Sequence, residues 1–178
     1  MAIRMASKSK NKGKGFEREV ANYLSDLYQS SFTRVPHSGA FTGGKNAIRK
    51  ETLTEGQIRG YKGDIIPPDD WKKFNCECKN YAEFPFHQLL SQGKIGLLEA
   101  WTKQTLEAAD PGDVNIIFMK FDRRGRYVAY QLPLSFDNHR FIDYTDEAGN
   151  KWRITGFEDF FELNKDTFYQ VCKGVTNA

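Results

Sequence analysis

The sequence predicts a single α/β domain in which helices flank a mixed β-sheet. First, the apolar pattern runs in the order helix, several short strands, helix, strands and a closing helix. Second, residues 114–121 (VNIIFMKF) are apolar without alternation, which is typical of a strand buried on both faces at the centre of a sheet. Third, 178 residues with 39% hydrophobic composition suit one sizeable core.

The N-terminal region predicts a polar tail followed by a helix. Residues 1–12 carry four basic and no acidic residues, and we interpret them as a flexible basic tail preceding one domain over 13–178. Within 15–29, apolar side chains recur at intervals of three and four, as in a helix with one buried stripe. These side chains are Phe16, Val20, Tyr23, Leu24, Leu27 and Tyr28.

Three short strands are expected next, with a long loop between the first and the second. The strands cover residues 32–36, 61–66 and 73–79, and the loop at 37–60 is glycine-rich and basic. Loops of this length are uncommon in a compact domain unless they are functional or disordered. The Pro67-Pro68-Asp69-Asp70 segment predicts the turn that separates the last two strands.

The C-terminal half predicts helix, strands and helix. Helical spacing over 85–109 predicts one long helix, or two with a break at Gly93 or Gly96. The remaining elements are a strand at 114–121, a turn at 123–126, a strand at 127–132, a hairpin over 141–155 that turns at 147–150, and a closing helix at 157–172.

Charge and composition narrow the classes of function. The net charge is only +3, but residues 1–15 hold five basic and no acidic residues, and residues 34–62 hold six basic and two acidic ones. Two basic segments suit a polyanion such as DNA, although a solvated, solubilising tail is an equal alternative for residues 1–15. No apolar run reaches the length of a membrane span, and no signal peptide is evident, so we expect a cytoplasmic protein without membrane contact. Three cysteines suit neither a disulfide framework nor a four-ligand zinc site.

The residues best suited to chemistry are Asp64, Glu77 and Lys79. Because side chains alternate along a strand, Glu77 and Lys79 share one face, and Cys76 and Cys78 point to the other as core residues. If the strand beginning near Asp64 pairs with the next one, its carboxylate comes beside Glu77. Two carboxylates form the partial oxygen shell that Mg²⁺ prefers, and the lysine would offset developing negative charge. The alternative is a turn-capping aspartate and a surface Glu–Lys pair of little energetic value.

These residues belong to a longer pattern that resembles a known nuclease family. The elements of this pattern are Lys14-Gly15-Phe16-Glu17-Arg18-Glu19, Arg34, Ser38-Gly39, Gly63-Asp64-Ile65 and Glu77-Cys78-Lys79. In order and spacing they resemble the Holliday-junction resolvase branch of the PD-(D/E)xK nucleases over about residues 12–132, and the overall style is similar to small bacteriophage nucleases. The departures are a glycine in place of the proline before Asp64 and a long insertion between Gly39 and Gly63.

The resemblance implies a restriction-endonuclease-like fold and a metal site. Mg²⁺, for which Mn²⁺ could substitute, would be bound by Asp64, Glu77 and the main-chain carbonyl of Cys78, with Glu17 completing the acidic site. Glu17 also has a simpler interpretation, an exposed acid favourable near a helix N-terminus.

The resemblance also implies DNA contacts. Lys14, Arg18 and Arg34 match or adjoin phosphate-contacting positions, and Ser38 matches a serine near the scissile bond. A glutamine from the following helix is expected in the site. Gln88, Gln92 and Gln104 compete for this role, and the Trp101-Thr102-Lys103-Gln104 context favours Gln104.

The expected function is a Mg²⁺-dependent DNA endonuclease that is structure-selective in the manner of a junction resolvase. Lys45 and Arg49 of the basic loop are expected to help bind branched or duplex DNA. The alternatives are a nicking, repair or restriction-like nuclease on duplex or flap DNA, and a non-cutting DNA-binding module of the same fold. Symmetric cleavage of a junction by a chain with one site predicts a homodimer. Some of the apolar residues Phe157, Phe160, Phe161, Phe168 and Tyr169 are candidates for its surface, and packing over the sheet of the same chain is the alternative for each of them. If the chain is phage-encoded, it would act in the cytoplasm of the bacterial host.

Overall fold

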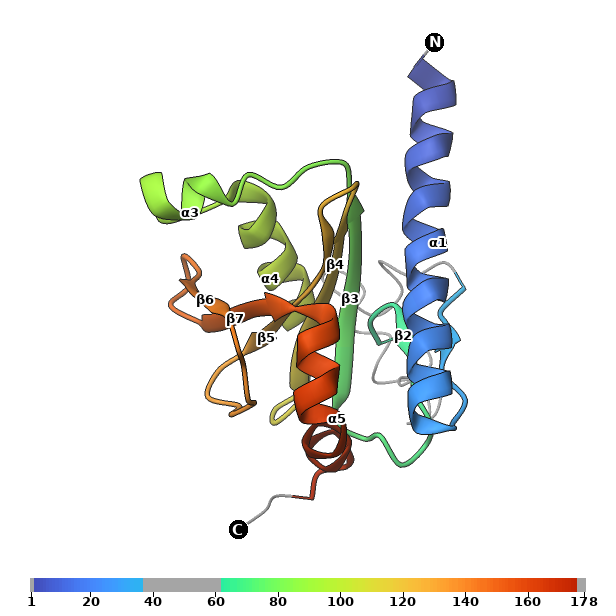
Figure 1. The fold of residues 1–178 in the computed structure, drawn as a ribbon. Coiled ribbons are helices and arrows are strands. Elements are labelled where there is room, and N and C mark those ends of the chain that lie inside the picture. Colours follow the sequence, from blue (N-terminus) through green and yellow to red (C-terminus); the bar gives the residue numbers. More distant parts are fainter. Residues whose placement is uncertain (1, 37–61, 176–178) are drawn as a thin grey trace.

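The structure is a computed structural model that describes the backbone of residues 2–36 and 62–175, and the side chains from Lys12 onward within those ranges. Its elements are α1 (Ala2–Tyr28), β1 (Thr33–Arg34), β2 (Ile65–Ile66), β3 (Phe74–Tyr81), α3 (His87–Ser91), α4 (Gly96–Ala108), β4 (Val114–Phe121), β5 (Gly125–Gln131), β6 (Phe141–Thr145), β7 (Lys151–Gly156) and α5 (Phe157–Lys173) (Figure 1). This order of elements confirms the predicted α/β class. The helical region after β3 takes the two-helix form, with the break between Ser91 and Gly96.

The main sheet has five strands in the order β3-β4-β5-β7-β6. β3 and β4 are parallel, and the remaining neighbours are antiparallel, so the sheet is mixed as expected. β4 is buried along nearly its whole length, as predicted, although it lies second in the strand order and β5 is at the centre. β3 lies at an edge, and this position leaves one side of its backbone open to groups outside the sheet.

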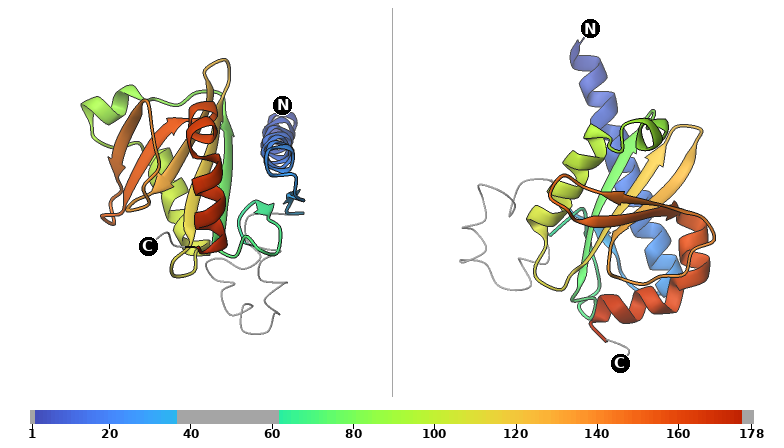
Figure 2. Two further views of the ribbon diagram at one scale, coloured as in Figure 1. Left: turned by 60° about the horizontal axis from the view of Figure 1, so that its bottom comes forward. Right: turned by 90° about the vertical axis from the view of Figure 1, so that its left-hand side faces the viewer.

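Helices cover both faces of the sheet because its apolar side chains alternate. Ile116 and Phe118 point to the layer formed with α1 and α5, whereas Ile117 and Met119 point to the layer formed with α4. Figure 2 shows α5 and α4 on opposite faces of the sheet, with α1 beside β3. The sheet, with β3 at its edge, is therefore packed between two apolar layers.

Helix α1 begins well before the predicted residue 15. It starts at Ala2, because residues 2–12 contain Ala, Met, Lys and Arg, which have high helix propensity despite the lack of an apolar stripe. From Phe16 onward the stripe packs as expected, and Val20 and Leu24 are fully buried. Whether residues 1–12 behave as a tail separate from a domain over 13–178 remains a prediction.

The expected pairing of the second strand was wrong. β2 is only two residues long and pairs antiparallel with β1 in a separate two-stranded sheet. The segment before it is tied to β3 by a single backbone bond, from Asp64 N to Cys76 O at 3.0 Å. The physical reason is the bend at Gly63, whose φ of +67° is incompatible with an extended ladder.

Of the five C-terminal aromatic residues considered as candidates for a dimer surface, four follow the alternative and pack over the sheet of the same chain. Phe157, Phe160, Phe161 and Phe168 are at most 2% exposed and belong to the core layer between α5, α1 and the sheet. The fifth, Tyr169, is half-buried against the same cluster. The closing helix carries more aromatic side chains than one narrow stripe because it contacts both the sheet and α1.

Candidate active site

Gly63 allows Asp64 to reach the edge of β3. A Cβ at position 63 would lie 2.3 Å from the carbonyl oxygen of Cys76, and the positive φ adds to the strain, so a side chain here must displace the backbone. With glycine in place, the Asp64 amide bonds Cys76 O, and its Oδ2 accepts a hydrogen bond from the Cys78 amide at 2.7 Å. Val35 N donates to Asp64 O at 2.9 Å and holds the other side of the segment.

Glu77, Lys79 and Gln104 form a closed triangle of hydrogen bonds. Lys79 Nζ donates to Glu77 Oε2 at 3.0 Å and to Gln104 Oε1 at 2.7 Å, and Gln104 Nε2 donates to Glu77 Oε2 at 3.0 Å. Glu77 and Lys79 therefore lie on one face of β3, as predicted, while Cys76 and Cys78 are buried in the core on the other. Of the three glutamines that competed, the structure places Gln104 of α4 beside the strand.

The carboxylates of Asp64 and Glu77 are both buried, and the positive charge of Lys79 does not fully offset their negative charges. Asp64 and Glu77 are 5% and 4% exposed. Burial and, after it, the negative charge of Asp64 raise the pKa of Glu77 to about 7, and Lys79 only partly opposes the shift. The arrangement is costly for a purely structural pair, and a divalent cation between the carboxylates would relieve it.

The donor set fits a hard cation such as Mg²⁺. Carboxylate oxygens come from Asp64 and Glu77. Because backbone carbonyls of alternate residues point to the same strand edge, Cys78 O faces the edge on which Cys76 O bonds Asp64. Oxygen ligands of this kind are those that Mg²⁺ takes, usually with several waters retained. Within the described ranges no group of three or more His, Cys, Asp and Glu side chains is placed to hold a metal, so the site rests on two carboxylates and a carbonyl.

Glu17 and Arg34 are brought together beside this site. Arg34 Nε donates to Glu17 Oε2 at 2.5 Å, because β1 runs alongside α1. Glu17 is 8% exposed, so it is not the surface acid of the simpler interpretation. The structure gives Arg34 a carboxylate partner rather than leaving it open toward DNA. The metal role of Glu17 and the phosphate role of Arg34 remain predictions.

Of the other residues predicted to contact DNA, two are exposed and three lie outside the described ranges. Lys14 and Arg18 are exposed on α1. Ser38, Lys45 and Arg49 fall in the long loop, which lies outside the described residues.

Lys62 was counted among the basic residues of segment 34–62, but the structure does not leave it available to DNA. It is 6% exposed and forms ion pairs with Asp110, at 2.9 Å, and with Asp113, whose side chain is 1% exposed. These ion pairs could not be predicted from the sequence, because Asp110 and Asp113 lie about 50 positions after Lys62, in the turn before β4. The buried pair fixes the chain two residues before Asp64.

A pocket opens next to Lys79. It has a volume of about 600 Å³ and is bounded by α1 on one side and β3 and its end on the other. Its lining residues are Lys12, Gly13, Cys78, Lys79, Asn80, Tyr81 and Ala82. Asn80 Nδ2 donates to Lys12 O at 3.1 Å and ties the two walls together.

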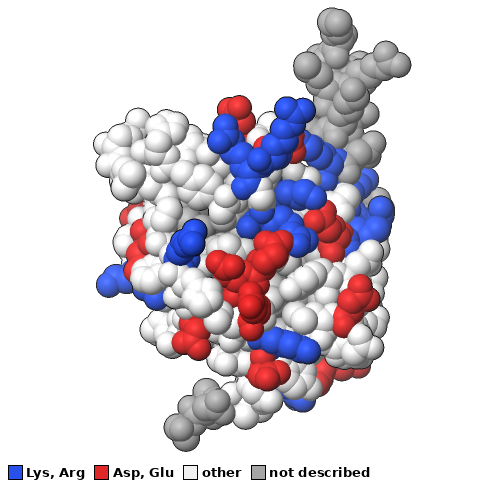
Figure 3. Space-filling model, viewed as in Figure 1, with Lys and Arg blue, Asp and Glu red and all other residues white. Residues whose placement is uncertain are grey.

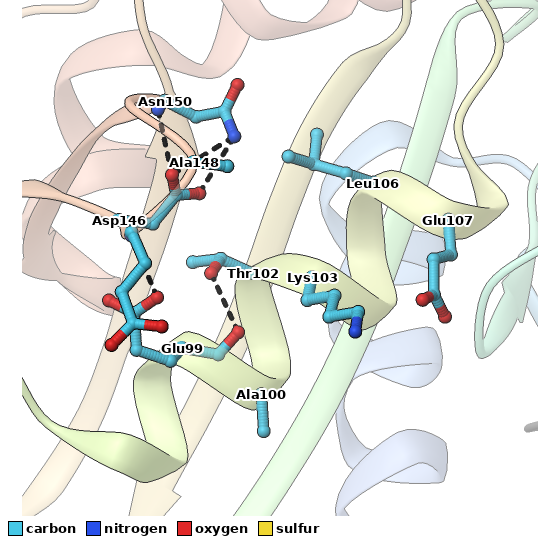
Figure 4. Close-up of a pocket in the computed structure, with 10 residues that line it drawn as sticks. Glu99, Ala100, Thr102, Lys103, Leu106, Glu107, Asp146, Ala148 and Asn150 are labelled. Carbon is cyan, nitrogen blue, oxygen red and sulfur yellow. Dashed lines mark hydrogen bonds between the residues drawn. The ribbon is translucent and has the colours of Figure 1, made fainter.

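A second pocket, between α4 and the turn joining β6 to β7, is separate from this chemistry. Figure 4 shows Asp146 in this turn, bonded to Asn150, and Glu99 and Thr102 on the helix. Asp146 also accepts a hydrogen bond from Trp152 Nε1, so it has a structural role in the turn. None of the predicted site residues lines this pocket.

The fold and the paired carboxylates with a lysine two residues further on define the PD-(D/E)xK class, with its restriction-endonuclease-like sheet. The sequence model of the family described as "Phage putative PDDEXK endonuclease" matches residues 8–170, and the chain belongs to this family. No curated protein and no solved structure matches the chain significantly. Within the described ranges, no helix is both long and apolar enough to span a membrane.

Proposed function

We propose that the chain is a Mg²⁺-dependent DNA endonuclease and that Asp64, Glu77, Lys79 and Gln104 form its active site. The observation that carries this proposal is the arrangement at the free edge of β3, where two buried carboxylates face each other and Gln104 bonds both Glu77 and Lys79. Membership of the endonuclease family supports cleavage over simple binding.

Each side chain has a distinct task in phosphodiester hydrolysis. Asp64 and Glu77 would hold the cation, which supplies charge stabilisation and a more acidic water when it is bound. Lys79, kept beside Glu77 by Gln104, places a positive charge next to the pocket through which DNA would approach. That charge offsets the negative charge that develops on the phosphate in the transition state.

Selectivity for branched DNA is the finer part of the proposal and rests on the resemblance to junction resolvases. Because each chain carries one such site, symmetric cleavage of a four-way junction needs two chains, so we propose a homodimer that acts on DNA in the cytoplasm. The buried phenylalanines of α5 are not its interface, and a different surface must serve.

The test is a cleavage assay on a panel of labelled duplex, flap, fork and four-way junction DNA. Each substrate is incubated with Mg²⁺, with Mn²⁺ and with EDTA. We expect cleavage in both metals, none in EDTA, and the highest rate on the junction. A preference for flap or duplex DNA would favour the nicking, repair or restriction-like alternative. Binding without cleavage in either metal would refute the endonuclease and leave a DNA-binding module.

The dimer has a separate test, light scattering of the protein alone and bound to a junction. We expect the mass of two chains. A monomer in both states at micromolar concentration would contradict the dimer and favour a simple nicking nuclease.

A further inference from the structure

The turn between β4 and β5 carries two arginines without acidic partners. Arg123 and Arg124 are both exposed, and neither forms an ion pair with another described residue. The neighbouring cations behave differently, since Lys120 and Arg126 are both paired with Glu19. The two turn arginines are therefore available to an external anion.

The backbone of this turn is held in a defined conformation. Arg124 N donates to Phe121 O at 3.1 Å, and Tyr127 Oη donates to Arg124 O at 2.7 Å. Arg123 has a φ of +58°, a left-handed conformation that residues other than glycine adopt uncommonly. A fixed backbone lowers the conformational entropy that an arginine loses on binding.

The arginines line a pocket that adjoins the pocket next to Lys79. A pocket of about 580 Å³ is lined by Ala82, Glu83, Asp122, Arg123 and Arg124, and it shares Ala82 with the pocket that contains Lys79. The two pockets therefore adjoin at Ala82, which lies between Lys79 and the turn, and together we call them the trough.

The walls of this trough are basic overall. On the α1 side Lys12 neutralises Asp122 through an ion pair, so Glu83 is the one acid lining the two pockets that has no ion pair within the described residues. Figure 3 shows Lys and Arg side chains gathered over the end of the molecule where α1 and the β4–β5 turn lie.

We infer that the trough from Lys79 to Arg123 and Arg124 binds the sugar-phosphate backbone of DNA on one side of the cleaved bond. This inference rests on the proposed function and names the surface on which the substrate would lie. Arginine forks match phosphate oxygens in bidentate geometry, and such contacts fix the register of a duplex without reading its sequence.

The experiment compares a double variant, Arg123→Asn with Arg124→Gln, with a matched double variant, Arg140→Gln with Lys165→Gln. Asparagine tolerates the left-handed backbone at position 123, and glutamine keeps the backbone carbonyl that Tyr127 bonds. The control removes the same charge from exposed positions outside the trough. Binding to a fluorescent duplex is measured in EDTA over a series of salt concentrations, and melting temperatures check folding.

We expect the slope of log K against log salt to become shallower by about 1–2 in the turn variant, at ~0.9 per lost phosphate contact, and to be unchanged in the control. In Mg²⁺, cleavage at low DNA concentration should fall by the same factor as affinity. Equal slopes and affinities in the two variants would overturn the inference. If the double variant melts early, Arg124→Gln alone decides in the same assay.

Because binding is measured without metal, the outcome is independent of cleavage. If the wild-type protein binds DNA but cuts none, the proposed function fails. The change in the slope of log K against log salt in the turn variant still tests whether the trough binds DNA.

Discussion

At the scale of single residues, Gly63 determines whether Asp64 can reach Cys78. We predict that Gly63→Ala lowers cleavage by about 10²-fold or more, because a displacement of about 1 Å at an active site has effects of this size. The displacement is required by the 2.3 Å separation between the new Cβ and Cys76 O. Single-turnover cleavage at saturating DNA measures it.

The matched control for this prediction is Gly149→Ala. Gly149 also has a positive φ, of +88°, but nothing lies within 4 Å of a Cβ built there. It should cost about 1–2 kcal/mol of stability from backbone strain without loss of cleavage. Equal cleavage by the two alanine variants would show that the close approach at Gly63 is not needed.

Glu77 should make the stability of the metal-free protein depend on pH. Its pKa is raised from 4.5 to about 7 by burial and by Asp64, against the opposing effect of Lys79. The folded state therefore binds the proton more tightly than the unfolded state. This contribution to stability is fully present below about pH 4.5 and is lost as pH rises to about 7. The loss above pH 7 is about 3 kcal/mol.

Urea denaturation in EDTA at pH 5 and pH 8 measures this effect. Glu77→Gln should remove most of the decrease and be more stable than wild type at pH 8. The exposed Glu162→Gln on α5 should follow wild type. If Glu77→Gln is less stable than wild type by the same amount at pH 8 and at pH 5, burial and Asp64 do not destabilise the charged form of Glu77.

The chemical residues could be predicted from sequence because the two-residue repeat of a strand fixes which side chains share a face. That repeat placed Glu77 and Lys79 together and Cys76 and Cys78 in the core, as observed. The pairing of Glu17 with Arg34 could not be predicted, because it depends on how α1 packs against β1.

At the scale of elements, β1 and β2 show why the pairing prediction failed. Each is two residues long, and alternation carries no information over so short a span. The bend at Gly63 and the ion pairs of the buried Lys62 direct the chain away from a ladder with β3. Helix α1 was underestimated for a related reason, since residues 2–12 have helix-forming side chains but no apolar period to reveal them.

Helix α5 provides a prediction at this scale. Phe160→Ala should lower the free energy of unfolding by about 3–5 kcal/mol, because Phe160 is fully buried between the sheet and other aromatic rings. Denaturant unfolding measures this loss. Phe141→Ala, at a 50% exposed aromatic position on β6, should cost much less. A Phe160→Ala variant that kept full stability and changed only its oligomeric mass would restore α5 as an interface.

At the scale of the whole molecule, the basic N-terminus should add to DNA affinity. Deleting residues 1–12 removes Arg4, Lys8, Lys10 and Lys12. Because Lys12 is paired with Asp122, three of the four can contact phosphates, and the slope of log K against log salt should become shallower by up to about 3, at ~0.9 per contact. Binding to a duplex in EDTA across a salt series measures this. An unchanged slope would mean that the segment is only solvated.

The overall architecture was predictable because several independent signals agreed. The buried strand β4, the helical period of α4 and α5, and the turn residues between strands all indicated one mixed sheet with helices on both faces. The trough beyond Lys79 was not predictable, because Lys12 and Asp122 are far apart in sequence and meet only through the packing of α1 beside β3 and the length of β4.

The central claim is that the carboxylate pair at the edge of β3 cuts DNA. The most direct measurement is single-turnover cleavage in Mg²⁺ by wild type, Asp64→Asn, Glu77→Gln and Lys79→Met, with DNA affinity measured in EDTA on the same samples. We expect each variant to lose cleavage by several orders of magnitude while DNA affinity and melting temperature stay near or above those of wild type, since metal and lysine stabilise charge chiefly in the transition state. Cleavage at the wild-type rate by both carboxylate variants would contradict the account.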